Sequence, residues 1–410
     1  MIERTVYKQI LHSISLCPVT LITGARQVGK TTLCLKLRDE MDYRYVSLRD
    51  KAERAMAMTD PEMFLQLHQW PLIVDEVQYA PSLLETIEGV VDKMKERGED
   101  NKGMFVLTGS QAYKMMEGVS DSLAGRIAVI NMSPLSMSEI LGREEKPFTI
   151  DIPENAKRSS EADINPRRFY DRLVRGMYPE PETEPELTTN EFYSDYVDTY
   201  INRDVCEIVN VVNKTKFFSF MQLMASLTGQ ELNYERIGSD IGIDGKTVKS
   251  WVSVLIAGDI IHLLQPYNDS STSKRLVKRP KMYFWDTGLA CYLARVLDAD
   301  SLIAGYLKGP MTETYMVNEI LKSYRNNRMA SPCYYYRDSN GNEVDIVMVR
   351  EGEVSLIECK SGTEFGWNDI KTIDRGIPTQ YPITGRCVIC LASKPYPIND
   401  KVYAIPFTAI

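Results

Sequence analysis

The sequence predicts an α/β protein built from successive parts, and three observations support this fold class. Residues 1–142 alternate short apolar runs with amphipathic stretches, as expected for a parallel sheet covered by helices on both faces. Residues 143–168 are polar and charged, which predicts a linker. Residues 169–294 have helical periodicity and then a helix–turn–helix pattern before a basic hairpin, which resembles a winged helix. Residues 295–410 return to strand-like runs after one helix, which predicts a second α/β domain.

Bulk properties narrow the classes of protein that remain. A chain of 410 residues is too long for one hydrophobic core. The net charge of -8 argues against nucleic-acid binding by the whole surface, so any such role requires a local basic patch. The sequence has no apolar run long enough for a transmembrane helix, and charges are spread through its first residues. With eight scattered cysteines as well, we expect a protein of the reducing cytoplasm.

Four apolar runs in the first part are predicted to be strands: 18–24, 43–48, 71–76 and 103–110. The first of them leads into a segment that fits the pattern G-x-x-x-x-G-K-[ST] and opens a helical stretch, which is the context that this phosphate-binding motif requires. Glycine backbones let amide groups point at phosphate oxygens, and the helix N-terminus adds partial positive charge. We therefore expect ATP and Mg²⁺ as ligands. The predicted cofactor-binding residues are Gly24, Ala25, Arg26, Gln27, Val28, Gly29, Lys30, Thr31 and Thr32.

Individual roles follow from the chemistry of a triphosphate site. Lys30 is predicted to contact the β- and γ-phosphates, and Thr31 to offer its hydroxyl to Mg²⁺. The apolar run PLIVDE ends in Asp75 and Glu76, so Asp75 would support the magnesium shell and Glu76 would polarise the attacking water. The alternative is that both acids lie in a solvated turn at the end of a strand.

Two further residues are candidates for contact with the γ-phosphate. Ser110, at the end of the run MFVLTGS, is predicted to act as a polar sensor, with a plain turn residue as the alternative. Arg126 precedes another apolar run and could reach the γ-phosphate of a neighbouring subunit in a homo-oligomer. The alternative for Arg126 is a structural salt bridge.

The helix–turn–helix segment is predicted to bind DNA phosphates. Val248, Val252, Leu255 and Ile256 would form the inner face of its second helix, and Lys246, Lys249, Ser250 and Ser253 the outer face. The alternative is packing against the first domain or a partner protein. The hairpin that follows is also predicted to contact DNA phosphates, through Lys274, Arg275, Lys278, Arg279 and Lys281.

The motifs together resemble prokaryotic AAA+-like ATPases that carry a C-terminal domain of unknown function. ITGARQVGKTT, PLIVDEVQYAPSLLETI, KTVKSWVSVLIAGDIIHLLQPY and EVDIVMV…IECKSG carry the resemblance over nearly the whole chain. It implies an AAA+-type ATPase core, a winged helix and a C-terminal fold similar to PD-(D/E)XK nucleases. The polar insertion at 143–166 is longer than this pattern leads us to expect.

The C-terminal strand runs also carry a cluster of charged residues. A hairpin that turns near Gly352 would place Asp345 nearly opposite Glu358, with Lys360 on the same face as Glu358. Two carboxylates beside a lysine suit a nuclease in which Asp345 and Glu358 bind Mg²⁺ and Lys360 positions the water. Glu319, on the preceding helix, could add a carboxylate. The alternative is an ordinary solvated ion pair.

Two functional hypotheses remain open from the sequence. The first is an enzyme in which ATP hydrolysis drives a conformational change and the C-terminal module acts on DNA. The second is a regulatory switch or scaffold in which ATP binding sets the assembly state, and the nuclease-like module is catalytically inert and binds a partner. Cys387 and Cys390 are expected to be buried strand residues, because no second cysteine pair or nearby histidine would complete a zinc site.

Overall fold

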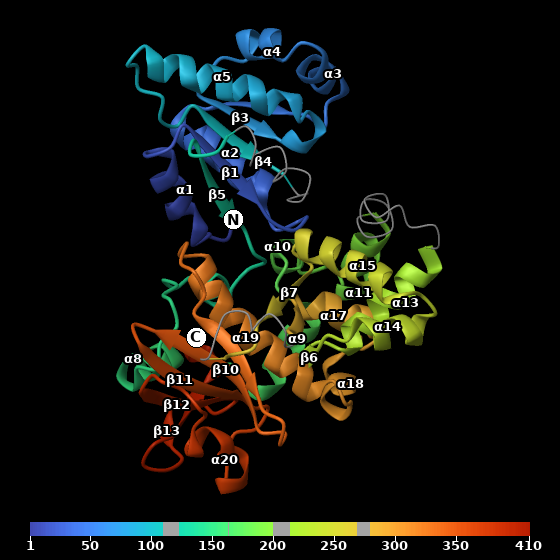
Figure 1. Cartoon of the computed structure of the whole chain (residues 1–410), viewed down its shortest axis with the longest axis vertical. Helices are drawn as coiled ribbons and strands as arrows, with labels where there is room; N and C mark the ends of the chain where they lie inside the picture. The colour runs from blue at the N-terminus through green and yellow to red at the C-terminus, as the bar shows by residue number, and fades with distance from the viewer. Residues whose placement is uncertain (110–122, 163, 200–213, 269–278) are drawn as a thin grey trace. The chain divides into compact units, whose positions relative to one another are not determined.

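The computed structural model describes residues 1–109, 123–162, 164–199, 214–268 and 279–410 (Figure 1). It separates into two compact units. The N-terminal unit contains Met1–Pro134 together with the short segments Ala257–Asp259 and Asn326–Arg328. The C-terminal unit contains the remaining described residues from Leu135 onward.

A five-stranded sheet forms the centre of the N-terminal unit. Its strand order is β2-β3-β4-β1-β5, and every pairing in it is parallel. The strands fall where the sequence predicts them: β1 Val19–Thr23, β2 Arg44–Ser47, β3 Leu72–Asp75, β4 Phe105–Thr108 and β5 Ile127–Asn131. Three of the five, β1, β3 and β4, are buried along their whole length and mainly apolar, which is characteristic of a parallel sheet covered on both faces.

Helices cover both faces of this sheet. The side chains of Leu21, Val74 and Leu107 pack in one core with Leu84 and Ile87 of α5. Alternate strand residues face the opposite side, where Figure 1 shows α1 and α2. The helices of the unit are α1 Val6–Ile14, α2 Lys30–Met41, α3 Lys51–Thr59, α4 Pro61–Leu67 and α5 Ser82–Glu96, with the 3₁₀ turn η1 Val77–Tyr79.

The C-terminal unit contains a larger sheet of mixed direction. Its strand order is β13-β14-β12-β11-β10-β9, with β11, β12 and β14 parallel and the other pairings antiparallel. One face packs on α20 through Ile370 and Ile373. The elements are β9 Cys333–Arg337, β10 Glu343–Arg350, β11 Glu353–Cys359, α20 Trp367–Arg375, β12 Ile383–Cys390, β13 Tyr396–Pro397, β14 Tyr403–Pro406 and the 3₁₀ turn η3 Phe407–Ala409.

A small antiparallel sheet in the same unit has the order β6-β8-β7. The chain that leaves β7 continues along β9: Tyr267 donates its N–H to the carbonyl of Tyr335 at 2.6 Å, and Tyr335 donates to Gln265 at 3.0 Å. The two sheets are therefore joined by backbone hydrogen bonds. The strands are β6 Gln230–Glu231, β7 Ile261–Leu264 and β8 Lys281–Phe284.

The described helices of the C-terminal unit surround these sheets. Capping residues that the sequence supplies define several of their starts, such as Ser136 before α7 and Thr188 before α11. The helices are α7 Met137–Ile140, α8 Ile152–Ser160, α9 Pro166–Arg175, α10 Pro179–Thr183, α11 Thr189–Tyr196, α13 Lys214–Ser226, α14 Tyr234–Ile241, α15 Gly245–Ala257, α17 Thr287–Leu293, α18 Ala299–Ala304 and α19 Lys308–Arg325. None of the helices in the described ranges is long and apolar enough to cross a membrane.

The segment 143–168 differs from the linker that its composition predicts. It contains α8, on which Asn155, Arg158 and Ser159 are buried. Arg158 donates hydrogen bonds to the carbonyls of Ala409 at 3.1 Å and Ile410 at 3.0 Å. Some of its polar side chains, Asn155 and Arg158 among them, satisfy backbone groups inside the unit, so composition alone misidentified the segment. The compact units likewise divide at Pro134, and the expected parts 169–294 and 295–410 share one unit.

Candidate functional site

The strand order of the N-terminal unit brings three loops together. Strand β4 lies between β3 and β1, so the carboxyl ends of β1, β4 and β3 are neighbours at one edge of the sheet. These ends carry the glycine-rich loop, Thr108 and Asp75 respectively. Ligands of open parallel sheets bind at this kind of edge.

The loop from Gly24 to Gly29 has the backbone conformation that the motif requires. Gly24, Gln27 and Gly29 have φ values of 139°, 60° and 96°, all in the region that favours glycine. A side chain at Gly24 would place its Cβ 2.1 Å from the carbonyl oxygen of Met132. Helix α2 begins at Lys30, directly after the loop, and its N-terminal amides are available to bind phosphate.

Lys30 is folded back onto the loop. Its ammonium group donates hydrogen bonds to the carbonyl oxygens of Gly24 at 2.8 Å and Ala25 at 2.6 Å. Burial lowers its pKa to about 8, although the charges of Glu76 and Asp75 oppose this shift. A buried ammonium group is stabilised by a nearby negative charge, and a bound phosphate group would supply one here.

Asp75 is the centre of a hydrogen-bond network at the end of β3. Thr31 donates its hydroxyl to Asp75 at 3.2 Å, and Tyr45 of β2 donates to the same carboxylate oxygen at 3.0 Å. Thr108 of β4 donates to the other oxygen. The hydroxyl of Thr31 and the carboxylate of Asp75 are the hard oxygen ligands that Mg²⁺ prefers, so the residues present fit this ion.

Glu76 lies beside Asp75 in a left-handed backbone conformation with φ of 61°. Its N–H donates to the Thr108 hydroxyl at 3.1 Å, and its carboxylate accepts from Arg49 and Gln78. Burial would raise the pKa of Glu76, but the bonds from Arg49 and Gln78 outweigh it and hold the pKa below its usual range. Glu76 is therefore a carboxylate at neutral pH.

Thr108, Tyr45 and Arg49 join this network although sequence reasoning did not select them. Ser110, which it did select as the sensor, lies outside the described residues. Thr108 ends β4 and Arg49 lies just beyond β2, and both strands pair with β3. Their positions relative to the strand ends were the signal that could have identified them. Tyr45 is the second residue of β2, so this signal does not mark it.

Arg126 binds acidic residues of its own unit. Its guanidinium pairs with both carboxylate oxygens of Asp92 at 2.7 Å and with Glu88 at 3.1 Å, both on α5. This arrangement is the structural salt bridge that was the alternative to a catalytic arginine.

The second helix of the helix–turn–helix segment is α15, and its two faces differ as predicted with two exceptions. Val248, Val252 and Leu255 are buried, whereas Ile256 is 36% exposed. Trp251 takes the inner position instead, in contact with Phe217 and Phe220 of α13. The exposed residues of the outer face are Lys246, Lys249, Ser250 and Ser253. Lys274, Arg275 and Lys278 lie outside the described residues, and Arg279 is exposed.

The β10–β11 hairpin has the predicted register. Ile346 pairs with Ile357, so the preceding residue Asp345 falls opposite Glu358. Asp345 accepts a hydrogen bond from the N–H of Cys359 at 2.8 Å, and Lys360 contacts Glu358 at 2.9 Å. Burial, and then the charge of Asp345, raise the pKa of Glu358 to about 8.

A buried lysine lies beside Asp345 and two further carboxylates, Glu313 and Glu343. This residue is Lys281, at the start of β8, and its side chain is only 3% exposed. The prediction that it belongs to a basic hairpin facing DNA was therefore wrong. Its ammonium group lies 2.5 Å from Glu343, 2.9 Å from Glu313 and 3.7 Å from Asp345. Burial alone would lower the pKa of Lys281, but these three carboxylates hold it above its ordinary value.

The third carboxylate of this cluster is Glu313 and not Glu319. Both belong to α19, but Glu319 faces another direction, where it accepts from the N–H of Met137 at 2.7 Å and pairs with Lys322 at 2.9 Å. Glu313 accepts from Tyr283 at 2.7 Å as well as from Lys281. Helical periodicity explains the error, because six residues place the two side chains on different faces.

The two residues predicted to bind Mg²⁺ have different lysine partners. Lys281 lies 3.7 Å from Asp345 and also contacts Glu313 and Glu343, whereas Glu358 pairs with Lys360 at 2.9 Å. Metal binding by Asp345 and Glu358 stays a prediction. Within the described ranges, no group of three acidic, histidine or cysteine residues has the geometry to hold a metal. Cys387 and Cys390 are buried in β12, in line with the strand assignment.

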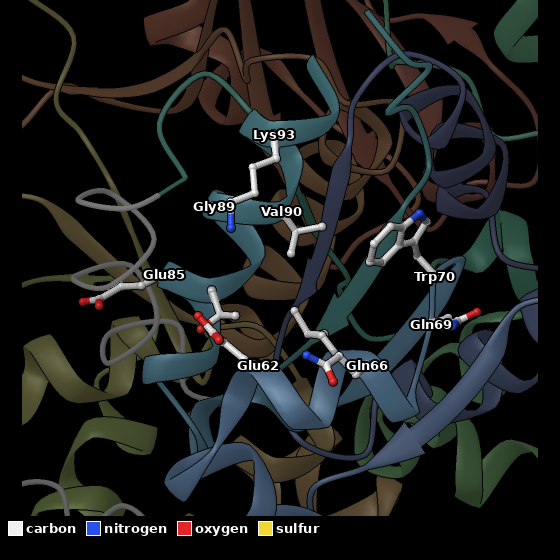
Figure 2. Close-up of a pocket in the computed structure, with 10 residues that line it drawn as sticks. Glu62, Gln66, Gln69, Trp70, Glu85, Gly89, Val90 and Lys93 are labelled. Carbon is white, nitrogen blue, oxygen red and sulfur yellow. The ribbon is translucent and has the colours of Figure 1, made fainter. Parts of the chain in front are cut away.

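The N-terminal unit also has an open groove between α4 and α5, with a volume of about 980 Å³. Figure 2 shows Glu85, Gly89 and Lys93 along α5, with Gln66 and Trp70 on the other wall. No residue of the glycine-rich loop lines it. The groove is therefore separate from the candidate nucleotide site.

Family models match three successive parts of the chain. Residues 17–141 match an AAA domain, residues 166–300 match a domain of unknown function designated DUF8612, and residues 308–410 match a second one, DUF4143. The N-terminal unit has a P-loop ATPase fold. The parallel sheet, the glycine-rich loop and the acidic strand end all lie within the matched AAA region.

Individual proteins are similar to the chain at low identity. Uncharacterised proteins of Mycobacterium tuberculosis and Mycobacterium bovis are each 22% identical over 407 residues, which is 98% of this chain and 83% of theirs. A Walker-type ATPase of Pyrococcus abyssi is 13% identical with a TM-score of 0.42, and the match covers 72% of this chain and 96% of that one. DnaA of Aquifex aeolicus is 15% identical with a TM-score of 0.28, over 61% and 85% of the two chains.

Proposed function

We propose that the protein binds ATP with Mg²⁺ at the edge of the N-terminal sheet and hydrolyses it. The observation that carries this proposal is the convergence of Lys30, Thr31, Asp75 and Glu76 around the end of β3. An amide-lined loop, a lysine, a magnesium ligand set and an ionised carboxylate are the parts that phosphoryl transfer to water requires.

Each side chain has a separate role in this proposal. Lys30 would exchange the carbonyls of Gly24 and Ala25 for phosphate oxygens when ATP enters, and Thr31 and Asp75 would hold Mg²⁺. Glu76 orients the attacking water and accepts its proton. Because Arg49 and Gln78 bind Glu76 in the structure, the carboxylate must exchange at least one of these partners before it can act.

The change Lys30→Ala tests ATP binding. We expect the Kd for ATP to rise about 10- to 100-fold, because charge-assisted hydrogen bonds to phosphate contribute about 1.5–3 kcal/mol. Binding is measured by isothermal titration calorimetry with Mg²⁺ and a non-hydrolysable ATP analogue. Lys36→Ala is the matched control, since Lys36 lies on the same helix but outside the loop. Equal affinities for Lys30→Ala and the parent would contradict the proposed site.

We also propose that the outer face of α15 contacts nucleic-acid phosphates. Lys246 and Lys249 are exposed there beside Ser250 and Ser253, and the opposite face of the helix is fixed by Trp251. Lysine and hydroxyl side chains on one exposed helix face are suited to the phosphate backbone.

The double change Lys246→Glu and Lys249→Glu tests this surface. We expect the affinity for double-stranded DNA to fall about tenfold at low salt, and the slope of log Kd against log salt to decrease by about 2. Fluorescence anisotropy over a salt series measures both. Glu substitutions of Lys157 and Lys371, which are exposed elsewhere in the C-terminal unit, control for net charge. An equal loss in the control pair would exclude a specific role for α15.

Metal-dependent DNA cleavage by the C-terminal unit stays a prediction of the sequence, in which Asp345 pairs with Lys281 and Glu358 with Lys360. Arg126 is left outside the catalytic groups, because Glu88 and Asp92 bind it.

A further inference from the structure

Arg4 connects the glycine-rich loop to the chain that follows β5. The residue lies just before α1 and is 7% exposed. One guanidinium nitrogen donates to the carbonyl oxygen of Val28 at 2.7 Å, and another donates to that of Ser133 at 2.6 Å. Both acceptors are buried backbone groups, so the guanidinium is held in one orientation by two strong bonds.

The bond to Val28 fixes a peptide group in the middle of the loop. In a trans peptide the carbonyl oxygen of one residue and the N–H of the next point in opposite directions. With the Val28 oxygen held toward Arg4, the N–H of Gly29 points away from Arg4. The phosphate-binding motif requires the amides of this stretch to point inward at the phosphates. Arg4 therefore holds the Gly29 amide in the orientation that binding needs.

The bond to Ser133 connects the same peptide to a rigid support. Met132 donates its N–H to Thr23 at 2.8 Å, and its carbonyl oxygen lies against the α-carbon of Gly24. The start of the loop thus rests on residues that follow β5. Arg4 attaches the middle of the loop to the next residue of the same support. Without this link, the Val28 carbonyl loses the side-chain hydrogen bond that connects it to Ser133, while the bond from the Leu33 N–H to the Gly29 carbonyl remains.

We propose that Arg4 is a positioning residue of the nucleotide site, which orients the Val28–Gly29 peptide toward the bound phosphates. This role rests on the proposed ATP binding. Arg4 touches neither nucleotide nor water in the reaction, so it acts through the loop. An amide that contacts the phosphates in both the ground state and the transition state contributes uniform binding, which lowers KM and leaves kcat nearly unchanged.

Steady-state hydrolysis by the full chain tests this role. We expect Arg4→Ala to raise the KM for ATP about tenfold, because the loss corresponds to about one strong hydrogen bond. The kcat should stay within about threefold of the parent. Arg4→Lys can keep one of the two hydrogen bonds, so its KM should lie between those of the parent and Arg4→Ala. Methylguanidinium at millimolar concentration should restore KM in Arg4→Ala. Arg44→Ala is the matched control, because Arg44 is exposed in the same unit.

The outcomes separate the role of Arg4 from ATP binding itself. If the parent binds no ATP, the proposed function fails. If the parent binds ATP and Arg4→Ala has the same KM as Arg44→Ala, the role of Arg4 alone is overturned. It is also overturned if Arg4→Ala lowers kcat and thermal stability together and neither lysine nor methylguanidinium restores KM. Partial recovery of KM by either one supports the positioning role.

Discussion

Glu76→Gln is expected to reduce ATP turnover by at least about 100-fold while ATP binding is preserved. The substitution keeps the shape of the side chain but removes the negative charge that would accept a proton from water, and general bases contribute about 10²–10⁴-fold to rate. Glu76 is buried and ionised, and it lies directly after Asp75, the proposed magnesium ligand. Phosphate release under saturating ATP measures turnover, and titration calorimetry measures binding.

Two comparisons make this result specific. Glu62→Gln removes an exposed carboxylate from α4 of the same unit and should leave turnover unchanged within about twofold. Arg49→Ala removes the charged partner of Glu76 and should leave substantial activity, because the carboxylate remains. Full turnover by Glu76→Gln would show that another group activates the water.

Lys281→Met is expected to destabilise the C-terminal unit by about 3–5 kcal/mol, the usual cost of removing one partner from a buried ion cluster. The lysine is the shared counter-charge of Glu313, Glu343 and Asp345. Methionine fills much of the same volume, so the loss of stability results from the missing charge and not from a cavity. Urea unfolding followed by tryptophan fluorescence measures the effect, since Trp285 follows β8 and is buried.

The same variant should show a specific dependence on pH. Burial, and then the charge of Asp345, raise the pKa of Glu313 to about 7, and Lys281 opposes that shift. Without Lys281 the pKa of Glu313 rises further. A raised pKa means that the folded state favours the protonated acid, so stability is lost as pH rises toward and beyond the folded pKa. The loss in free energy of unfolding caused by Lys281→Met should therefore be smaller at about pH 6 than at about pH 8.5.

A surface pair provides the control for this charge effect. Lys146 contacts Glu154 at 3.1 Å, and both side chains are substantially exposed. Lys146→Met should cost less than about 1 kcal/mol at either pH. If Lys281→Met unfolds at the same urea concentration as Lys146→Met, the carboxylate cluster does not depend on its lysine.

The first part of the fold could be predicted from the sequence because its signals are local. Buried parallel strands read as continuous apolar runs, and the loop at Gly24–Thr31 has a fixed spacing between its phosphate-binding residues. The register of the β10–β11 hairpin could also be predicted from the sequence, since the turn at Gly352 and the two-residue strand period determine which residues face each other.

Other features depend on contacts between distant parts of the chain. Arg4 and Ser133 are 129 residues apart, and nothing near Arg4 in the sequence marks it as a loop contact. Lys281 looked like one more charge in a basic hairpin, but its burial depends on α19 and β10. Arg158 stands in a stretch whose composition is typical of a solvent-exposed linker, and only the folded unit supplies its carbonyl partners.

The backbone pairing of Tyr267 with Tyr335 has a consequence for how the second half of the protein can be subdivided. Sequence families place a border between residues 300 and 308, but the hydrogen bonds between the two sheets cross that border. A fragment cut there would expose an unpaired strand edge, and such edges invite self-association. The two halves are thus expected to unfold cooperatively, as one block.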